Sequence, residues 1–265
     1  MNFLRHYLLA LQFFTRIPVT GRLASWVGYS PAMLRASAAH FPGVGWLVGG
    51  ATGAASAALL LVLPNSAMAP LVVAVLGTVL SVLLTGAFHE DGLADVADGL
   101  GGSSERERAL AIMKDSRVGA FGALALVLVV LVKVSLLALI GSVDGLAMCW
   151  GLFAAHVVSR GYPLLLIRAM RHVGDEAGSK SKPLADQISV ASLLVAGLWL
   201  LAALVLVAWL REDIDWLVPV ACATLAWLLM WRWFERRLQG FTGDCLGATQ
   251  QVCEVAFYFG LALVF

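Results

Sequence analysis

Seven apolar runs follow one another along the chain, separated by shorter polar connections. They cover residues 43–63, 70–89, 119–141, 145–168, 188–210, 216–233 and 248–265. Because a helix needs about 20 apolar residues to cross a bilayer, the pattern predicts an all-α, polytopic membrane bundle of about seven transmembrane helices. The connections are too short for a separate soluble domain, so residues 1–265 are expected to form a single membrane domain.

A different pattern precedes the first run. Over residues 2–15, apolar side chains share one stripe of a helix and polar side chains share another: Phe3, Tyr7, Leu8, Leu11 and Phe14 against Arg5, Gln12 and Arg16. This pattern is typical of an amphipathic helix in the membrane interface, although a cap helix packed on the bundle would show it too. Pro18 and Gly21 are expected to end the helix.

The composition supports a membrane protein. Hydrophobic residues make up 60% of the chain and charged residues 13%, with a mean hydropathy of +0.87. In soluble domains, about 45–50% of the residues are apolar and about 25% are charged. The net charge of +1 gives no reason to expect a nucleic-acid partner, so the lipid bilayer is the expected environment. Four cysteines without a Cys-x-x-Cys pair indicate neither a disulfide framework nor a zinc site.

Basic residues alternate between the connections. Fifteen lie before the first run or in every second connection after it, and the other connections hold only Arg211. The fifteen are Arg5, Arg16, Arg22, Arg35, Arg106, Arg108, Lys114, Arg117, Arg168, Arg171, Lys180, Lys182, Arg232, Arg236 and Arg237. Because Lys and Arg concentrate in cytoplasmic connections, the pattern predicts a cytoplasmic N-terminus and an external C-terminus.

Acidic residues are absent from the first 89 positions, and then four occur within residues 90–98. Near hydrocarbon each carboxylate costs roughly 2.5–3.5 kcal/mol. Asp91, Asp95 and Asp98 share one face of a helix, where like charges repel unless they are neutralised. Since hard carboxylate oxygens suit Mg²⁺ or Mn²⁺, we predict that these three aspartates hold Mg²⁺. A solvated acidic helix start is the alternative.

The neighbours of this cluster extend the candidate site. His89 can accept a proton, donate to a phosphate or simply lie at the membrane interface. Gly92 and Gly99 lack side chains, so a bulky phosphorylated ligand can approach the backbone there. Glu90 points away from Asp91 on a helix and is not expected to bind the metal.

The next connection ends in Lys114, Asp115, Ser116 and Arg117, directly before a span. Two cations and a carboxylate at this place can hold a phosphate and complete a metal shell. Lys114 and Arg117 also fit simple anchors on the cytoplasmic side. Residues 89–118 are therefore the expected catalytic connection.

Three further charged residues lie in or beside predicted spans. Lys133 and Arg160 lie within spans, where a cation usually meets an anion of the protein or of a ligand. Asp244 lies between two glycines before the last span, where it either caps the helix or joins the site.

Six stretches are specific when taken together: residues 10–19, 41–45, 89–99, 112–119, 159–160 and 242–248. The decisive pair is His-Glu-Asp-Gly-Leu-Ala-Asp-Val-Ala-Asp-Gly followed by Ile-Met-Lys-Asp-Ser-Arg-Val-Gly. In this order the stretches resemble the cobalamin synthase family, the adenosylcobinamide-GDP ribazoletransferases. Residues 174–188 match weakly, so no substrate role is expected for Lys180 or Lys182.

The resemblance implies an enzyme of the bacterial cytoplasmic (inner) membrane. It would join adenosylcobinamide-GDP to α-ribazole or its 5′-phosphate and release GMP, which is the last joining step of cobalamin biosynthesis. The expected metal ligands are Asp91, Asp95, Asp98 and Asp115; the catalytic residues Asp115, His89, Lys114 and Arg117; and the substrate-binding residues Arg160, Asp244, Thr242, Gly92 and Gly99. A homo-oligomer is left open.

Two other classes of membrane protein share part of this pattern. A CDP-alcohol phosphotransferase also carries a membrane aspartate motif, but Leu100-Gly101 stands where that pattern has Ala-Arg. A cation transporter would use the same carboxylates, but transporters place them at mid-membrane, often in repeated halves. Here the carboxylates lie at the predicted cytoplasmic edge, without a detectable repeat.

Overall fold

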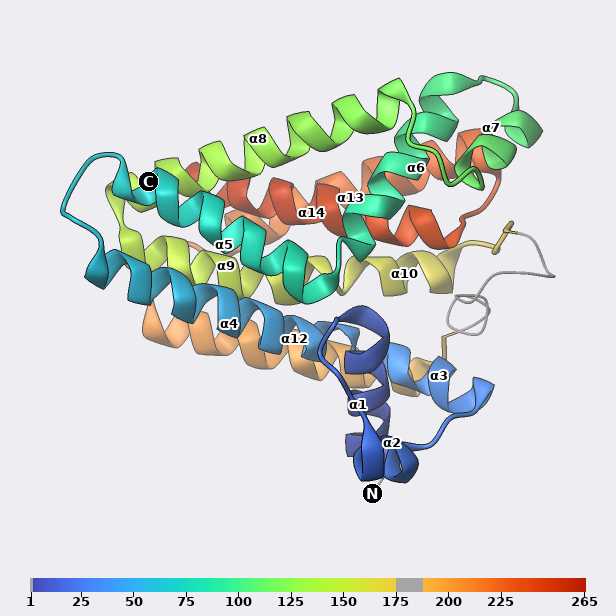
Figure 1. The fold of residues 1–265 in the computed structure, drawn as a ribbon, viewed down its shortest axis with the longest axis horizontal. Helices are drawn as coiled ribbons and strands as arrows, with labels where there is room; N and C mark the ends of the chain where they lie inside the picture. The colour runs from blue at the N-terminus through green and yellow to red at the C-terminus, as the bar shows by residue number, and fades with distance from the viewer. Residues whose placement is uncertain (1, 175–187) are drawn as a thin grey trace.

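The computed structural model describes residues 2–174 and 188–265, and this part of the chain is built from helices without a strand (Figure 1). The all-α prediction is confirmed. The elements are α1 (Asn2–Phe14), α2 (Gly21–Val27), α3 (Pro31–Ser37), η1 (Ala38–His40), α4 (Phe41–Val62), α5 (Ala69–Thr85), α6 (Phe88–Gly102), α7 (Arg106–Met113), α8 (Ala120–Val143), α9 (Gly145–Ser159), α10 (Tyr162–Ala169), α12 (Val190–Leu210), α13 (Leu217–Leu238) and α14 (Gly243–Ala262).

Each predicted span coincides with a long helix or a pair of helices that continue one another. By length and hydropathy, four helical segments of the described chain are able to cross a membrane: Pro31–Val62, Ala120–Val143, Val190–Leu210 and Leu217–Leu238. A fifth is added if the bent pair α5 and α6 counts as one span. A multi-pass helical bundle is therefore confirmed, whereas the count of seven is not.

The amphipathic N-terminal helix forms as α1 and runs across the direction of the long helices in Figure 1. Leu9, Leu11 and Phe14 are buried in the protein core, while Phe3 and Leu4 are more than half exposed. The helix thus packs on the bundle with one part and leaves apolar side chains uncovered with another. Its C-terminal end lies beside the start of α6, where Phe13 and Phe14 meet Phe88 edge-on.

Small residues at four-residue spacing let α4 lie directly against α9. A Cβ placed on Gly49 or Gly53 would lie 2.8 Å from the carbonyl oxygen of Phe153 or Cys149. Such close backbone approach is how helices pack in lipid, where no hydrophobic force drives them together. The first half of α4 is therefore buried among its neighbours, whereas Leu61 and Val62 at its end are exposed.

The helix that carries the aspartates is turned sharply away from α5. Gly86 and Ala87 both have left-handed backbones, with φ of 67° and 59°, and α5 and α6 meet at 91°. The predicted span therefore ends at Thr85 and not at residue 89. As a result α6 crosses one end of the bundle, beside α7 and the start of α14 (Figure 1).

The predicted span 145–168 is interrupted where α9 gives way to α10. Pro163 has no N–H, and a proline in a helix clashes with the carbonyl group four residues earlier, which here belongs to Ser159. The helix therefore breaks at Arg160 and Gly161 and restarts with Pro163 in its first turn.

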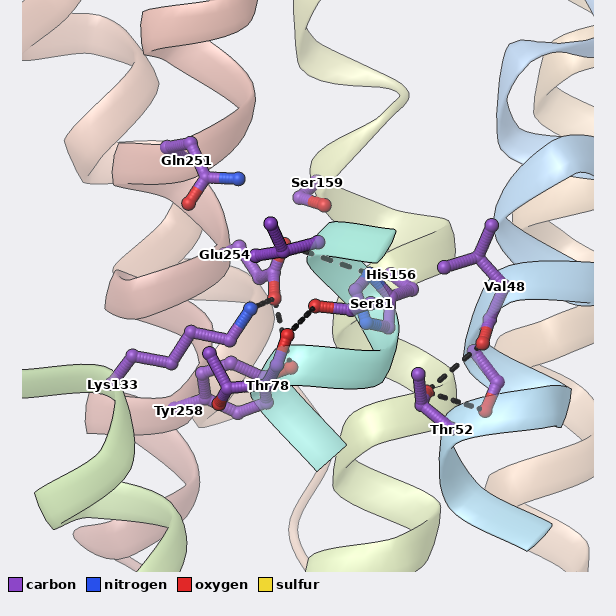
Figure 2. Close-up of polar contacts among 12 residues, drawn as sticks. Val48, Thr52, Thr78, Ser81, Lys133, His156, Ser159, Gln251, Glu254 and Tyr258 are labelled. Atoms are coloured by element: carbon purple, nitrogen blue, oxygen red, sulfur yellow. Dashed lines mark hydrogen bonds and ion pairs between the residues drawn. The ribbon is translucent and has the colours of Figure 1, made fainter. Parts of the chain in front are cut away.

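An ion pair lies inside the bundle, between α8 and α14. Lys133 Nζ is 2.6 Å from Glu254 Oε1, and both side chains are at most 3% exposed. Figure 2 shows Tyr258, whose hydroxyl donates to Glu254 Oε1 at 3.0 Å, and His156 of α9, whose Nδ1 lies 3.6 Å from Oε2. The side-chain amide of Gln250 donates to Glu254 Oε2 at 2.6 Å. The anion expected for Lys133 is therefore a carboxylate of the protein, which links α8, α9 and α14.

Glu254→Gln is expected to lower the free energy of unfolding by about 3–5 kcal/mol, because it leaves the Lys133 charge buried without its partner. The double variant Lys133→Met, Glu254→Gln should recover most of that loss. Thermal and denaturant unfolding of the purified protein in detergent measures both. Asp213 gives a control, because this carboxylate is exposed and its partner Arg211 also pairs with Asp144: Asp213→Asn should cost less than about 1 kcal/mol. Equal losses in the single and double variants would contradict this account.

Candidate active site

The predicted aspartates lie on one helix, α6, at the end of the bundle. Asp91 is exposed, Asp95 is half-buried and Asp98 is buried. Asp244 comes from the first turn of α14, which packs against α6. We refer to Asp91, Asp95, Asp98 and Asp244 as the acidic cluster.

Two glycines allow α6 and α14 to approach closely enough to form the acidic cluster. A Cβ on Gly92 would lie 2.8 Å from the carbonyl oxygen of Asp244, and one on Gly247 would lie 3.1 Å from that of His89. Any larger residue at either place would push the helices apart. The space beside Gly92 is thus filled by the backbone of α14 at Asp244. The space beside Gly99 is filled in the same way by the carbonyl group of Ala109 and the side chain of Met113, both from α7.

Electrostatic repulsion within the acidic cluster is evident in the pKa values. Burial, together with the charges of Asp244, Asp91 and Asp98, raises the pKa of Asp95 to about 7. Burial also raises the pKa of Asp244, with a contribution from Asp91. A site of this kind favours a proton or a cation beside the carboxylates.

Asp98 also binds the N-terminus of α8. Its two oxygens accept the backbone N–H groups of Gly119 at 2.7 Å and Gly122 at 2.8 Å, at the start of α8. A carboxylate stabilises a helix N-terminus by satisfying its free N–H groups and by interacting with the helix dipole. Asp98 therefore also fixes the connection that carries residues 114–117 beside α6.

In that connection, Asp115 and Arg117 form an ion pair. Arg117 Nε donates to Asp115 Oδ1 at 2.9 Å, and its backbone N–H donates to the same oxygen at 3.1 Å. These bonds lower the pKa of Asp115 to about 2. Both side chains are accessible to solvent, and Lys114 is exposed next to them. Asp115 is not among the charges that raise the pKa of Asp95.

The donor set of the acidic cluster consists of hard oxygens, as Mg²⁺ prefers. Within the described residues no three His, Cys, Asp or Glu side chains are arranged so that they hold one metal ion. Mg²⁺ usually takes only one or two carboxylates and completes its shell with water and substrate phosphate. Two carboxylates of the acidic cluster, Asp91 and Asp95, therefore fit Mg²⁺ in chemistry and number.

A cavity of about 360 Å³ opens beside the acidic cluster. Asp91, Gly92, Gly243 and Asp244 line one part of it, and the rest of the wall is mainly apolar. We call it the aromatic pocket, because its wall includes the rings of Phe13, Phe14, Phe41, Phe88 and His89. A pocket that joins an apolar wall to a few polar groups is typical of a small-molecule site.

The remaining predicted residues have structural partners. Thr242, and not Asp244, caps α14: its hydroxyl accepts the backbone N–H of Cys245 and donates to Asp244. Arg160 is 1% exposed, donates to the His156 carbonyl at 2.8 Å and lies 5.7 Å from the centre of the Phe41 ring. Lys180 and Lys182 lie outside the described residues.

Sequence reasoning missed two groups of residues. The aromatic wall was one, because Phe14, Phe41 and Phe88 belong to three separate predicted segments or their edges. The other was the surroundings of Glu254, including the hydrogen bond from Gln251 to Glu90 at 3.1 Å. A signal for Glu254 did exist, because a lone carboxylate in an apolar span is rarely left without a cation.

Comparisons with known proteins agree with one another. A sequence model of the family described as cobalamin-5-phosphate synthase matches residues 6–262. A protein of Albidiferax ferrireducens, named adenosylcobinamide-GDP ribazoletransferase, is 64% identical over 276 aligned positions that cover 99% of each chain. Relatives of the same name in Vibrio cholerae and Shewanella piezotolerans are 42% and 40% identical, covering 95% and 97% of this chain and 91% and 95% of theirs. No solved structure matches the chain at a significant level.

Asp98→Ala is expected to lower the free energy of unfolding by about 0.5–2 kcal/mol, because it removes the acceptor for two N–H groups of α8. Asp91→Ala should leave stability unchanged or raise it, since that carboxylate is exposed and repels Asp95. Both are measured by unfolding in detergent without divalent cations. If Asp91→Ala lowers the free energy of unfolding as much as Asp98→Ala does, the structural role assigned to Asp98 alone is wrong.

Proposed function

The chain belongs to the cobalamin-5-phosphate synthase family, and we propose that it acts as an adenosylcobinamide-GDP ribazoletransferase in the last joining step of cobalamin assembly. The observation that carries the proposal is the 64% identity over 99% of both chains to a relative of that name. The substrates would be adenosylcobinamide-GDP and α-ribazole or its 5′-phosphate. The products would be adenosylcobalamin or its 5′-phosphate and GMP.

The enzyme would work in the bacterial cytoplasmic membrane, with its N-terminus and its site on the cytoplasmic side. The distribution of basic residues along the sequence supports this orientation. In Figure 1, helices α1, α3, α6 and α7 gather towards one end of the bundle, and the C-terminus lies at the other. The acidic cluster belongs to the end that is rich in Lys and Arg.

The transfer requires a ribose hydroxyl of α-ribazole to attack the phosphorus that carries the cobinamide arm. A new phosphorus–oxygen bond forms, the pyrophosphate bond breaks, and GMP leaves with the electron pair of that bond. Most of the rate of such a reaction comes from positioning the reactants and neutralising phosphate charge. Lys114 and Arg117 are exposed cations beside α6 and are suited to hold the phosphates.

Asp115 would take the proton of the attacking hydroxyl. While Arg117 is bound to Asp115, the pKa of Asp115 is about 2, and this carboxylate accepts a proton poorly. A phosphate that draws Arg117 away would remove the bonds that lower this pKa. Binding of the diphosphate substrate would in this way turn Asp115 into a better base, in the place where a base is needed.

Mg²⁺ would be held by Asp91 and Asp95, with Asp244 and Asp98 beside them. When bound, the ion supplies positive charge that neutralises the diphosphate. Glu90 is bonded to Gln251 on the side that faces α14, which agrees with a metal set that does not include it.

Asp95→Ala is expected to lower turnover by about 100-fold or more, while the protein still inserts and purifies. The assay follows adenosylcobalamin formation by the purified enzyme in detergent at saturating Mg²⁺. Glu107→Gln is the matched control, because Glu107 is an exposed carboxylate on α7 and should leave turnover unchanged. Full activity of Asp95→Ala would refute the assignment of the site.

Mg²⁺ affinity is expected to rise with pH and to level off above about pH 8. Protons compete with the cation for Asp95, whose pKa of about 7 leaves it half protonated near neutrality. Calorimetric titrations in buffers of different ionisation enthalpy should therefore show proton release on Mg²⁺ binding at pH 7. Affinity that does not change between pH 6 and pH 8 would contradict this.

A further inference from the structure

The rings of the aromatic pocket support one another as a rigid wall. Phe14 stacks on Phe41 with ring centres 4.1 Å apart, and Phe41 stacks on His89 at 5.6 Å with an interplanar angle of 15°. Phe88 meets Phe14 edge-on at 5.9 Å, and Phe13 meets Phe88 in the same way. Flat rings held in this way offer stacking and edge contacts to another flat ring.

His89 adds a flat ring to this wall. The side chain is 1% exposed, and its Nε2 has almost no accessible surface, so a ligand in the pocket meets the ring and not this nitrogen. The rings of the wall therefore offer apolar and stacking contacts to a ligand.

The size and polarity of the pocket exclude most parts of the two substrates. Its volume of about 360 Å³ lies at the small end of ligand sites, too small for a corrin macrocycle. Guanine carries several donors and acceptors around its edges, whereas His89, Asp91 and Asp244 are the polar side chains of this lining. A benzimidazole is flat, uncharged and bicyclic, and as a riboside it keeps a single free ring nitrogen.

We infer that the aromatic pocket binds the benzimidazole base of α-ribazole, with the base against Phe14 and Phe41. The inference rests on the proposed function and names the place of one substrate. The ribose then lies towards Asp91 and Asp244, where the attacking hydroxyl is needed. Helix α1 supplies Phe13 and Phe14, so the N-terminal helix forms a wall of the substrate site.

Phe14→Leu and Phe41→Leu test the stacking. Each variant raises the KM for α-ribazole about 3- to 10-fold and leaves the KM for adenosylcobinamide-GDP unchanged. Equilibrium dialysis with labelled α-ribazole alone, on the purified full-length protein, gives the same loss of affinity. Phe234→Leu is the matched control, because Phe234 is fully buried but does not line the pocket; both KM values stay unchanged.

Two outcomes overturn the inference. A rise in the KM for adenosylcobinamide-GDP alone assigns the pocket to guanine, and unchanged KM values for both substrates assign it to neither base. A wild-type protein that binds α-ribazole but forms no cobalamin contradicts the proposed function and not the pocket. Dialysis requires no turnover, so the two failures are distinguished.

Discussion

Repulsion among the carboxylates of α6 and α14 is the constraint on which the site depends. The two helices meet through Gly92 and Gly247, and this contact places Asp244 next to Asp91 and Asp95. Burial adds to the repulsion and raises the pKa of Asp95 to about 7. The fold thus holds together charges that would separate in a free chain, and it creates a place where a cation is favoured.

Other features of the fold serve the same arrangement. The left-handed residues Gly86 and Ala87 turn α6 across the end of the bundle, so that its aspartates reach the start of α14. Asp98 connects α6 to α8, and the buried pair of Lys133 and Glu254 connects α8 to α14. These contacts fix three helices around the cluster, and a preorganised set of charges is what phosphoryl transfer requires.

Local sequence patterns were enough to predict much of this structure. Apolar runs predicted where the long helices lie, and the spacing of Asp91, Asp95 and Asp98 correctly placed them on one helix. The breaks at residues 86–87 and 160–161 were not predicted, because an apolar run looks the same whether its helix is straight or bent. Contacts between residues far apart in the sequence were not predicted either. The pairing of Lys133 with Glu254 and the assembly of the rings of the aromatic pocket depend on how the helices pack.

Binding of a divalent cation by the acidic cluster can be measured by titration with Mn²⁺. Manganese has the same preference for hard oxygen ligands as magnesium, and electron paramagnetic resonance reports the free ion. The account predicts that the purified wild-type protein reduces the free-ion signal and that the double variant Asp91→Ala, Asp95→Ala does not. Equal Mn²⁺ binding by both proteins would contradict it.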